Sequence, residues 1–187
     1  KYATFAYVVG LKDCIEKALA AMSAALKKTE EGLRVQSLCY SIREMNVGDR
    51  VPDFTLPTPN GKEVNFYSFL KGKKCVILDF WASWCVWCRK ESPNVRKVFD
   101  TYKAKGVDVI SVSFDTNRDQ WVKAIAEDDT PWTQVSDLKS TDEGYLYKWY
   151  GLQGIPAIFL IDAQGRIIAK GMRGAAIEEN VKKFLNK

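Results

Sequence analysis

The spacing of apolar side chains divides residues 74–185 into short strands and longer helices. Short apolar runs bounded by turn residues indicate buried strands, whereas apolar residues three or four positions apart indicate one face of a helix. The pattern predicts strands over residues 76–80, 107–114, 132–135, 157–161 and 167–171. It predicts helices over residues 89–105, 118–127, 142–150 and 175–185. Strands that alternate with helices and then end in a hairpin and a helix indicate an α/β fold with a mixed central sheet flanked by helices.

The first part of the chain follows a different pattern. An amphipathic helix ended by Gly32 is predicted from apolar residues at three- and four-residue spacing: Leu11, Ile15, Ala18, Leu19 and Met22. A shorter second helix is predicted from Leu38, Ile42 and Met45. Neither helix can bury its apolar stripe alone. We therefore expect both to pack on the main domain, on an upstream segment or on a second chain.

A β-hairpin is predicted between these two regions. Residues 51–56 alternate between apolar and polar side chains, and residues 63–66 follow a turn that contains Pro, Asn and Gly. The patterns together predict a helical N-terminal extension over residues 1–46 and an α/β domain, beginning with this hairpin, over residues 47–187.

Composition excludes several kinds of site. The 187-residue chain contains no histidine, which excludes Ser-His-Asp and Cys-His catalysis and His-ligated zinc or iron. Its net charge of +5 is spread along the chain, so we expect no nucleic-acid partner. No apolar stretch approaches the roughly 18 residues of a membrane-spanning helix, so we expect no transmembrane segment. Because the sequence begins at Lys1 without a signal peptide, we expect that targeting information has been removed upstream.

The candidate chemistry is concentrated in Cys85 and Cys88, which follow a predicted strand and open a predicted helix. A thiol at a helix N-terminus faces unpaired backbone N–H groups and the positive end of the helix dipole, and both favour the thiolate. Cys85 is therefore the expected nucleophile. Cys88, one turn into the helix, can resolve a mixed disulfide. The alternatives are half of a zinc site, which would lack a second Cys-x-x-Cys pair, and an inert disulfide.

Residues 79–88 (Asp-Phe-Trp-Ala-Ser-Trp-Cys-Val-Trp-Cys) resemble the active-site segment of thioredoxin. Residues 154–157 (Gly-Ile-Pro-Ala) resemble its cis-proline loop. Pro93 matches the proline that kinks the active-site helix in that family. Several motifs that occur in the same order make this resemblance specific.

Three further segments narrow the resemblance to one branch of the family. Residues 51–54, 60–63 and 69–73 resemble the N-terminal hairpin of the TlpA/ResA-like branch, which comprises extracytoplasmic thiol-disulfide oxidoreductases. The resemblance covers residues 47–187. Residues 1–45 loosely resemble the helical segment ahead of this domain in longer bacterial envelope proteins.

The resemblance implies a thioredoxin-like fold and the activity of a protein thiol-disulfide oxidoreductase with a redox disulfide between Cys85 and Cys88. It implies partners of two kinds: client proteins that carry thiols or disulfides, and a redox donor protein. It also implies a location in the bacterial periplasm or cell envelope. No bound cofactor and no metal is implied.

Two acidic residues accompany the cysteine pair. Asp79 lies inside an apolar strand, where burial without a partner raises the carboxyl pKa and makes it a candidate proton acceptor for Cys88. It matches the buried aspartate of thioredoxin, but Ser111 stands where the lysine that pairs with that aspartate would fall. Glu91, one turn after Cys88, matches an active-site glutamate of the TlpA/ResA-like branch, which implies that it modulates the two thiol pKa values. The alternatives are solvent-exposed carboxylates with no role in the chemistry.

Four residues are expected to contact a client protein. By resemblance, the Ile155–Pro156 peptide bond is cis and lies against the cysteines, so that the Ile155 backbone can pair with an extended client segment. Trp84 and Trp87 are expected beside the thiols, with Trp87 exposed to the client. The related Trp81 is expected in the core. Trp87 departs from the family, because the residue before the second cysteine is more usually proline.

The other three cysteines are expected to be structural. Cys14 and Cys39 fall on the apolar stripes of the two N-terminal helices and are most simply small buried hydrophobic residues. In an oxidising compartment a Cys14–Cys39 disulfide could instead join the two helices. Cys75 opens a strand and is expected to be buried.

Two alternative functions are compatible with the same motifs. The first is a peroxiredoxin-type thiol peroxidase, because residues 112–115 and the hairpin also resemble that family. A peroxidatic site has Thr three residues before its cysteine, however, and here Ala82 occupies that position. The second is a non-catalytic thioredoxin-fold binding module with an idle disulfide.

Overall fold

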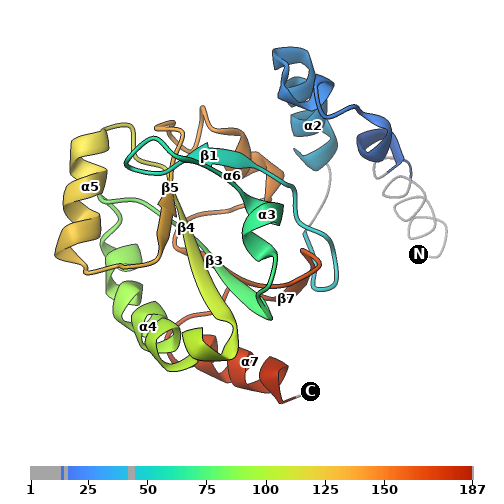
Figure 1. The fold of residues 1–187 in the computed structure, drawn as a ribbon. Coiled ribbons are helices and arrows are strands. Elements are labelled where there is room, and N and C mark those ends of the chain that lie inside the picture. Colours follow the sequence, from blue (N-terminus) through green and yellow to red (C-terminus); the bar gives the residue numbers. More distant parts are fainter. Residues whose placement is uncertain (1–13, 15–16, 42–44, 187) are drawn as a thin grey trace. The chain divides into compact units, whose positions relative to one another are not determined.

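The computed structural model describes residue 14, residues 17–41 and residues 45–186 (Figure 1). Contacts divide the chain into two units. One comprises Lys1–Met45 with Tyr145–Gly151, and the other comprises Asn46–Gly144 with Leu152–Lys187. The predicted domains, residues 1–46 and 47–187, stay a prediction.

The second unit is built on a five-stranded sheet with the strand order β5-β4-β3-β6-β7. The strands are β3 (Cys75–Trp81), β4 (Val107–Ser113), β5 (Thr133–Val135), β6 (Ala157–Asp162) and β7 (Ile167–Lys170). The central strand β3 pairs in parallel with β4 and antiparallel with β6. The mixed sheet predicted from the strand pattern is therefore confirmed, each strand lying within two residues of its expected bounds.

Three long helices flank this sheet: α4 (Val86–Tyr102), α5 (Arg118–Glu127) and α7 (Ala175–Leu185). The bounds of α5 and α7 match the prediction. Helix α4 starts at Val86 rather than at residue 89, because Cys85 caps it. The chain leaves α4 through the short helix η2 (Lys103–Lys105), which ends at Gly106 with φ 86°, a left-handed conformation that favours glycine.

Helices α4 and α7 pack together on one face of the sheet (Figure 1). Their buried side chains, including Val95 and Val181, form a core with Cys75 and Ile77 of β3. Side chains alternate between the two faces of a strand, so Asp79 shares the face of Cys75 and Ile77. The sheet thus directs Asp79 toward α4, the helix that carries the cysteine pair.

A two-stranded hairpin precedes the sheet. It pairs β1 (Thr55–Pro57) with β2 (Glu63–Asn65) in antiparallel register, so the predicted hairpin is confirmed in shortened form. The alternation over residues 51–56 predicts a strand that begins at Val51, and this start is wrong, because residues 51–54 form no strand. Helix α3 (Phe66–Leu70), which no pattern predicted, follows directly because the Asn65 side chain accepts a hydrogen bond from the Ser68 backbone N–H and caps it.

The first unit contains helical residues 17–21, the short helix η1 (Leu26–Lys28) and helix α2 (Glu30–Ser41). The prediction that Gly32 ends the first helix is wrong, because Gly32 lies inside the first turn of α2. Thr29 starts that helix instead: its Oγ1 accepts a hydrogen bond from the Gly32 backbone N–H at 3.0 Å, as an N-cap does. Leu11, Ile15 and Ile42, on which the helix predictions partly rest, lie outside the described residues.

Helix α6 (Tyr145–Trp149) belongs to this first unit and packs against α2. The Trp149 indole Nε1–H donates to Ser37 Oγ at 2.8 Å. The helix is shorter than the predicted span of residues 142–150, since turns occupy the residues before Gly144. Of the three partners expected for the second predicted helix, the predicted main domain (residues 47–187) supplies one, helix α6, although contacts group α6 with the first unit.

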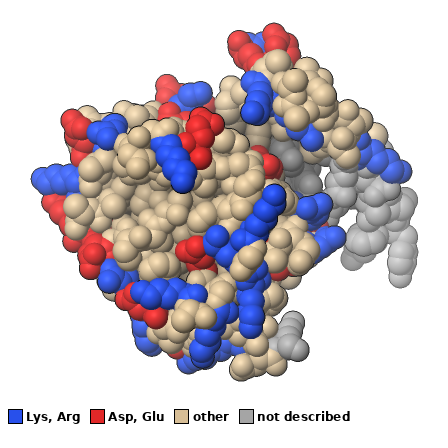
Figure 2. All heavy atoms as spheres, in the orientation of Figure 1, with Lys and Arg blue, Asp and Glu red and all other residues tan. Residues whose placement is uncertain are grey.

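Charged side chains of both signs are interspersed on the face of the molecule shown in Figure 2, around an uncharged central area. Such mixing is typical of an ordinary solvated surface. Among residues 14, 17–41 and 45–186, no helix is long and apolar enough to cross a membrane.

Candidate active site

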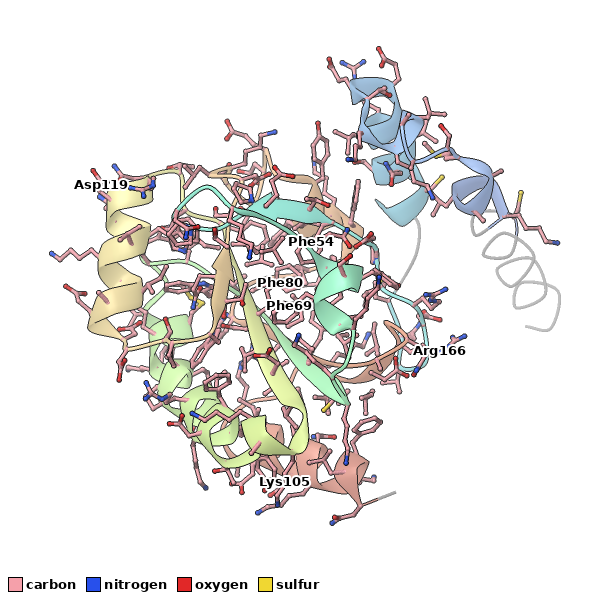
Figure 3. All side chains as sticks on the ribbon, in the orientation of Figure 1. Phe54, Phe69, Phe80, Lys105, Asp119 and Arg166 are labelled. Carbon is pink, nitrogen blue, oxygen red and sulfur yellow. A yellow bond between two sulfur atoms is a disulfide. The ribbon has the colours of Figure 1, made fainter. Side chains whose placement is uncertain are left out.

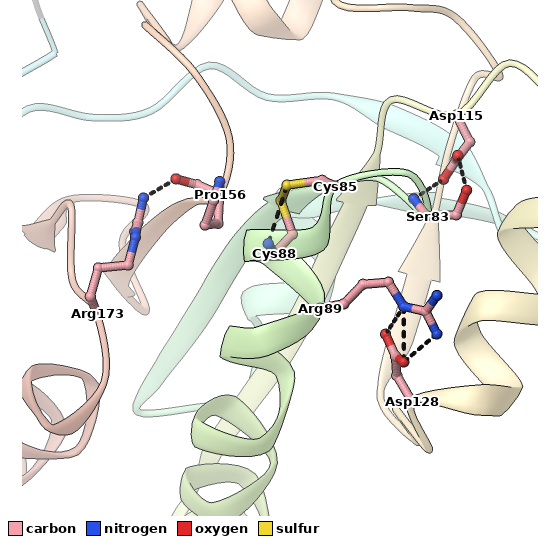
Figure 4. The surroundings of a disulfide bond; sticks show 8 residues. All are labelled: Ser83, Cys85, Cys88, Arg89, Asp115, Asp128, Pro156 and Arg173. Carbon is pink, nitrogen blue, oxygen red and sulfur yellow. Dashed lines mark hydrogen bonds and ion pairs between the residues drawn. A yellow bond between two sulfur atoms is a disulfide. The ribbon is translucent and has the colours of Figure 1, made fainter.

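The cysteine pair lies at the N-terminal end of α4, a few residues after the end of β3 (Figure 4). Cys85 and Cys88 form a disulfide with an S–S distance of 2.07 Å. Cys85 is the N-cap of α4, and its Sγ accepts a hydrogen bond from the Cys88 backbone N–H at 3.2 Å. In the reduced protein the same N–H and the helix dipole would stabilise a Cys85 thiolate. Both residues are more than nine-tenths buried, with exposures of 7% and 4%.

Asp115 fixes the loop that leads to Cys85. Its carboxylate accepts hydrogen bonds from the Ser83 backbone N–H at 2.9 Å, from Ser83 Oγ at 2.6 Å and from Ser113 Oγ at 2.6 Å. Asp115 itself is 1% exposed. Sequence reasoning missed this residue. The available signal was its position just after a strand parallel to β3, because adjacent parallel strands end at the same edge of a sheet.

Asp79 lies on β3 directly opposite Ser111 of β4. Ser111 Oγ donates to Asp79 Oδ2 at 3.0 Å and accepts the indole Nε1–H of Trp132 at 2.8 Å. Burial raises the pKa of Asp79 to about 6, against the opposing effects of the Ser111 hydrogen bond and the positive charge of Arg173; the negative charge of Glu91 raises it further. The predicted direction of the pKa shift is thus confirmed, although Asp79 has a hydrogen-bond partner in Ser111.

Glu91 connects α4 to the loop before α7. Its Oε2 accepts hydrogen bonds from the Gly174 backbone N–H at 2.9 Å and from Asn94 Nδ2 at 3.0 Å. The side chain is only partly exposed. Glu91 therefore makes hydrogen bonds within the protein and is not fully solvated. Its negative charge acts on Asp79. Its effect on the thiol pKa values stays a prediction.

The loop before β6 lies against the cysteines. The Ile155–Pro156 peptide bond is cis, as the resemblance implied. Ile155 packs on the cluster that contains both cysteines and Trp81, and Pro156 is buried. Within the part of the chain that the structure describes, the Ile155 backbone has no hydrogen-bond partner. Its N–H and C=O groups are available to an extended ligand.

Two tryptophans and a valine form an exposed apolar surface at the pair. Trp84 is 60% exposed, Val86 64% and Trp87 70%. The Lys90 ammonium lies over the Trp87 ring at 4.4 Å from its centroid. Trp81, in contrast, is buried as predicted and donates its indole N–H to Gln134 Oε1 at 3.1 Å. Large exposed aromatic side chains beside a reactive group are typical of a protein-docking surface.

Arg89 joins α4 to the end of α5. Its guanidinium donates to both carboxylate oxygens of Asp128, at 2.6 to 3.0 Å, and to Glu127 Oε2 at 2.8 Å. Beside this ion pair, a depression of about 250 Å³ lies between Trp84 and α5. Sequence reasoning did not identify this connection, which fixes the position of α4 one residue after Cys88.

The three remaining cysteines carry free thiols in this structure. Cys75 is fully buried as predicted, and burial raises its pKa to about 12. The expectation of a buried Cys14 is wrong: it is exposed, as are Lys17 and Ala18 on the next turn, so it lies on the solvent side of its helix. Cys39 is partly buried, and burial raises its thiol pKa. The alternative of a Cys14–Cys39 disulfide is not formed here.

Among the residues whose placement is described, no cluster of three or more Cys, Asp or Glu residues could hold a metal ion. The site itself presents two adjacent sulfur atoms, a carboxyl group with a raised pKa and an exposed apolar surface.

A five-stranded mixed sheet, a Cys-x-x-Cys pair at the start of a helix and a cis-proline against it define a thioredoxin-fold dithiol protein. The AhpC/TSA family matches residues 47–170, and the chain belongs to this family.

Known relatives agree with this assignment. The thiol-disulfide oxidoreductase ResA of Bacillus thuringiensis subsp. konkukian is 31% identical over 144 residues, which are 77% of this chain and 79% of the relative. The crystal structure of the thioredoxin domain of a thiol-disulfide oxidoreductase from Bacteroides vulgatus has a TM-score of 0.70 and 37% identity, covering 76% of this chain and 100% of that one. The solution structure of a thiol:disulfide interchange protein from Bacteroides sp. has a TM-score of 0.69 and 36% identity, covering 76% and 92%.

Proposed function

We propose that this protein is a thiol-disulfide oxidoreductase that exchanges disulfides with client proteins through Cys85 and Cys88. The observation that carries the proposal is the Cys85 N-cap, where a backbone N–H already points at Sγ. The relatives named ResA and DsbE support the activity.

Reduction of a client takes two steps. The Cys85 thiolate attacks one sulfur of the client disulfide, an S–S bond forms between the two proteins, and the other client sulfur leaves as a thiolate. Cys88 then loses its proton and attacks Cys85 Sγ, which releases the second client thiolate and leaves the Cys85–Cys88 disulfide. Two electrons pass to the client, and a redox donor protein must return them. Oxidation of a client runs the same steps in reverse.

Asp79 is the proposed acceptor of the Cys88 proton. The argument rests on its position on the α4 face of β3 and on a pKa near 6, which leaves much of the carboxyl ionised at neutral pH yet basic enough to take a proton. Glu91 is proposed to modulate the same site through its negative charge.

The client is proposed to bind as an extended segment across the pair. The unpaired backbone groups of Ile155, beside Pro156, would hydrogen-bond to it in the manner of a short β-strand. Trp84 and Trp87 would cover the client side chains that flank its cysteine. The resemblance to extracytoplasmic oxidoreductases supports a location in the periplasm or cell envelope.

Trapping tests this function. We expect Cys88→Ser to accumulate mixed disulfides with a client protein such as insulin, because the first attack remains and resolution is lost. Cys85→Ser should form none. Cys75→Ser is the matched control and should behave like the parent protein, since its thiol is buried. All variants should carry Cys14→Ser and Cys39→Ser, because the exposed Cys14 would otherwise form its own adducts. Absence of reducible adducts in Cys88→Ser would contradict the proposal.

A peroxide-consumption assay addresses the peroxidase alternative. Ala82, where a peroxidatic site has Thr, is fully buried and offers no hydroxyl to a peroxide. We expect insulin reduction with little peroxide turnover. Peroxide turnover without insulin reduction would favour the peroxidase. Absence of both activities would favour the binding module.

A further inference from the structure

A line of three polar side chains crosses the sheet on the face that packs against α4. Asp79 lies on β3, Ser111 opposite it on β4, and Trp132 directly before β5. Trp132 shares a buried cluster with Val107 and Val109, and side chains alternate along a strand, so Ser111 lies on the same face of β4 as these valines. Figure 3 shows that side chains fill the space between the sheet and α4. Ser111 is 1% exposed and Trp132 6%, so the two residues meet inside the protein.

Two hydrogen bonds join these side chains, and the chemistry of the groups fixes their direction. The indole Nε1–H of Trp132 can only donate, and it donates to Ser111 Oγ at 2.8 Å. An ionised carboxylate can only accept, and Asp79 Oδ2 lies 3.0 Å from Ser111 Oγ. The Ser111 hydroxyl lies between a donor and an acceptor and has one proton. That proton is therefore directed to Asp79.

The opposite direction would leave a proton without an acceptor. If a protonated Asp79 donated to Ser111, the Ser111 oxygen would accept two hydrogen bonds, and its own proton would need a third partner. Among the residues that the structure describes, Ser111 Oγ has no third partner. A buried hydroxyl proton without an acceptor is unfavourable, whereas a hydroxyl that donates to a carboxylate forms a charge-assisted bond. The arrangement around Ser111 thus favours the ionised form of Asp79.

The indole of Trp132 is held in place by two elements. The ring centroid of Phe99, on α4, lies 5.7 Å from that of Trp132, with the ring planes tilted by 57°. The next residue, Thr133, pairs in β5 with Ile110, which directly precedes Ser111 in β4. The packing of α4 and the register of β5 therefore fix the donor that orients the Ser111 hydroxyl.

Other groups also act on Asp79. Burial has the largest effect on its carboxyl pKa and raises it, and the negative charge of Glu91 raises it further. The Ser111 hydrogen bond and the positive charge of Arg173 lower it. On β6 the residue opposite Asp79 is Ile158, which carries no charge. An uncharged substitution at the residue before β5 changes none of these charges, so its effect on Asp79 can be measured at constant surrounding charge.

We propose that Trp132 is a positioning residue for disulfide exchange: its indole N–H directs the Ser111 hydroxyl proton to Asp79 and so keeps that carboxyl ready to accept the proton of Cys88. The proposal deepens the function given above and rests on the proposed role of Asp79. It assigns a part in the proton transfer to a buried tryptophan outside the cysteine motif, acting through Ser111.

The test removes each hydrogen bond of the line separately. Trp132→Phe keeps an aromatic ring and removes the N–H, whereas Ser111→Ala removes the hydroxyl, and neither adds volume. Trp149→Phe is the matched control, because the Trp149 indole N–H also donates to a serine oxygen, Ser37 Oγ, at 2.8 Å, in the other unit. The first readout is the titration midpoint of the Asp79 carboxyl carbon, followed by NMR in the oxidised protein, where the paired cysteines do not titrate. The second is the pH profile of mixed-disulfide resolution.

We expect Trp132→Phe to raise the Asp79 midpoint by about half a pH unit and Ser111→Ala to raise it by about one. At pH 5, below the midpoint, resolution should be about threefold slower in Trp132→Phe, because a rise of half a unit lowers the ionised fraction by that factor. At pH 8 the carboxyl is ionised in both proteins, and the rates should agree. A tryptophan with only a structural role would lower the rate by the same factor at both pH values.

The double variant tests whether Trp132 acts through Ser111. In a Ser111→Ala background, Trp132→Phe should shift the midpoint no further, because the hydroxyl is gone. An unshifted midpoint in Trp132→Phe, an equal shift in Trp149→Phe or a full additional shift in the double variant would overturn the proposal. These outcomes leave intact the role of Asp79, which Asp79→Asn tests by itself. A raised midpoint with an unchanged pH profile of resolution would instead mean that Asp79 is not the proton acceptor, and the proposed role of Trp132 would fail with it.

Discussion

Asp115 and Asp79, two carboxyl groups on opposite sides of the disulfide, differ in the hydrogen bonds that they receive. The α5 side consists of Ser83, Arg89, Asp115 and Asp128, and the α7 side consists of Asp79, Glu91, Pro156 and Arg173 (Figure 4 shows members of both). On the α5 side, Asp115 receives three hydrogen bonds and Asp128 a bidentate guanidinium. On the α7 side, Asp79 receives one side-chain hydrogen bond, from Ser111, and its pKa is raised to about 6.

This difference separates a structural carboxylate from a reactive one. A buried carboxylate whose oxygens are filled by donors fixes the groups around it, and protonation would break those bonds. A carboxyl group that burial penalises, with few donors to compensate, can exchange a proton near neutral pH. Proximity to the cysteines therefore does not by itself indicate a chemical role, and the count of donors distinguishes the two residues.

The largest expected effect is on the resolution step. Asp79→Asn should slow attack of Cys88 on the mixed disulfide by about 10²–10⁴-fold, the usual range for general-base catalysis, and should leave the first attack by Cys85 within about threefold. Single-turnover reduction of a model disulfide, with the mixed intermediate and the final product followed separately, measures both rates.

Asp115→Asn is the matched control for that experiment. It should change both steps by similar, smaller factors, because the Asp115 carboxylate is bonded to Ser83 and Ser113 and holds the loop before Cys85. Equal rates of resolution in the parent and in Asp79→Asn would remove Asp79 from the mechanism. A selective loss of resolution in Asp115→Asn would reverse the assignment of the two sides.

The same pair of substitutions should shift stability in opposite directions. Asp79 has a folded-state pKa of about 6, above its ordinary value of 3.8, so folding favours its protonated form. That contribution to stability is fully present below about pH 3.8 and is lost as the pH rises through about 6, which amounts to about 2–3 kcal/mol. Asp79→Asn should therefore be about 1–3 kcal/mol more stable than the parent at pH 8 and should lack this part of the pH dependence.

Asp115→Asn should instead lose about 2–3 kcal/mol at the same pH, because one amide oxygen replaces two carboxylate oxygens and an N–H group is turned toward donors. Urea denaturation of the oxidised proteins at pH 4 and pH 8 measures both changes. A stabilised Asp115→Asn, or a destabilised Asp79→Asn at pH 8, would contradict the comparison.

The sequence is sufficient for the parts of the site that a short local motif marks. The cysteine pair, the cis-proline and the position of Asp79 on an apolar strand all followed from local pattern or resemblance. Ser83 and Asp115, in contrast, are 32 positions apart, and Glu91 and Gly174 are 83 apart. These contacts form only when the sheet places β3 beside β4 and α4 beside the loop before α7, and no periodicity encodes them.

The errors at the N-terminal end have a similar cause. The low helix propensity of glycine predicts a helix end at Gly32. The Thr29 side chain instead accepts a hydrogen bond from the Gly32 backbone N–H, and α2 packs on α6, and both contacts compensate for that propensity. The spacing of apolar residues predicts a buried Cys14, but spacing alone does not show which stripe of a marginal helix packs against a partner.

The smallest expected effect concerns the connection of α4 to α5. Arg89→Met keeps an unbranched apolar stem and removes the bidentate contact to Asp128, whose side chain is 13% exposed. The Arg89 side chain is 32% exposed, so solvent screens the pair, and we expect a loss of about 1 kcal/mol in the free energy of unfolding. Resolution of the mixed disulfide should change less than about threefold, since the contact lies on the α5 side, away from Asp79. Arg96→Met removes pairs with Asp100 on the same helix and with Asp129. It should cost less stability, because both carboxylates are more exposed than Asp128. Urea titration and the single-turnover assay, applied to both variants, measure these effects.

A large selective loss of resolution in Arg89→Met would mean that the α5 side takes part in the proton transfer, and the division between the two sides would then fail.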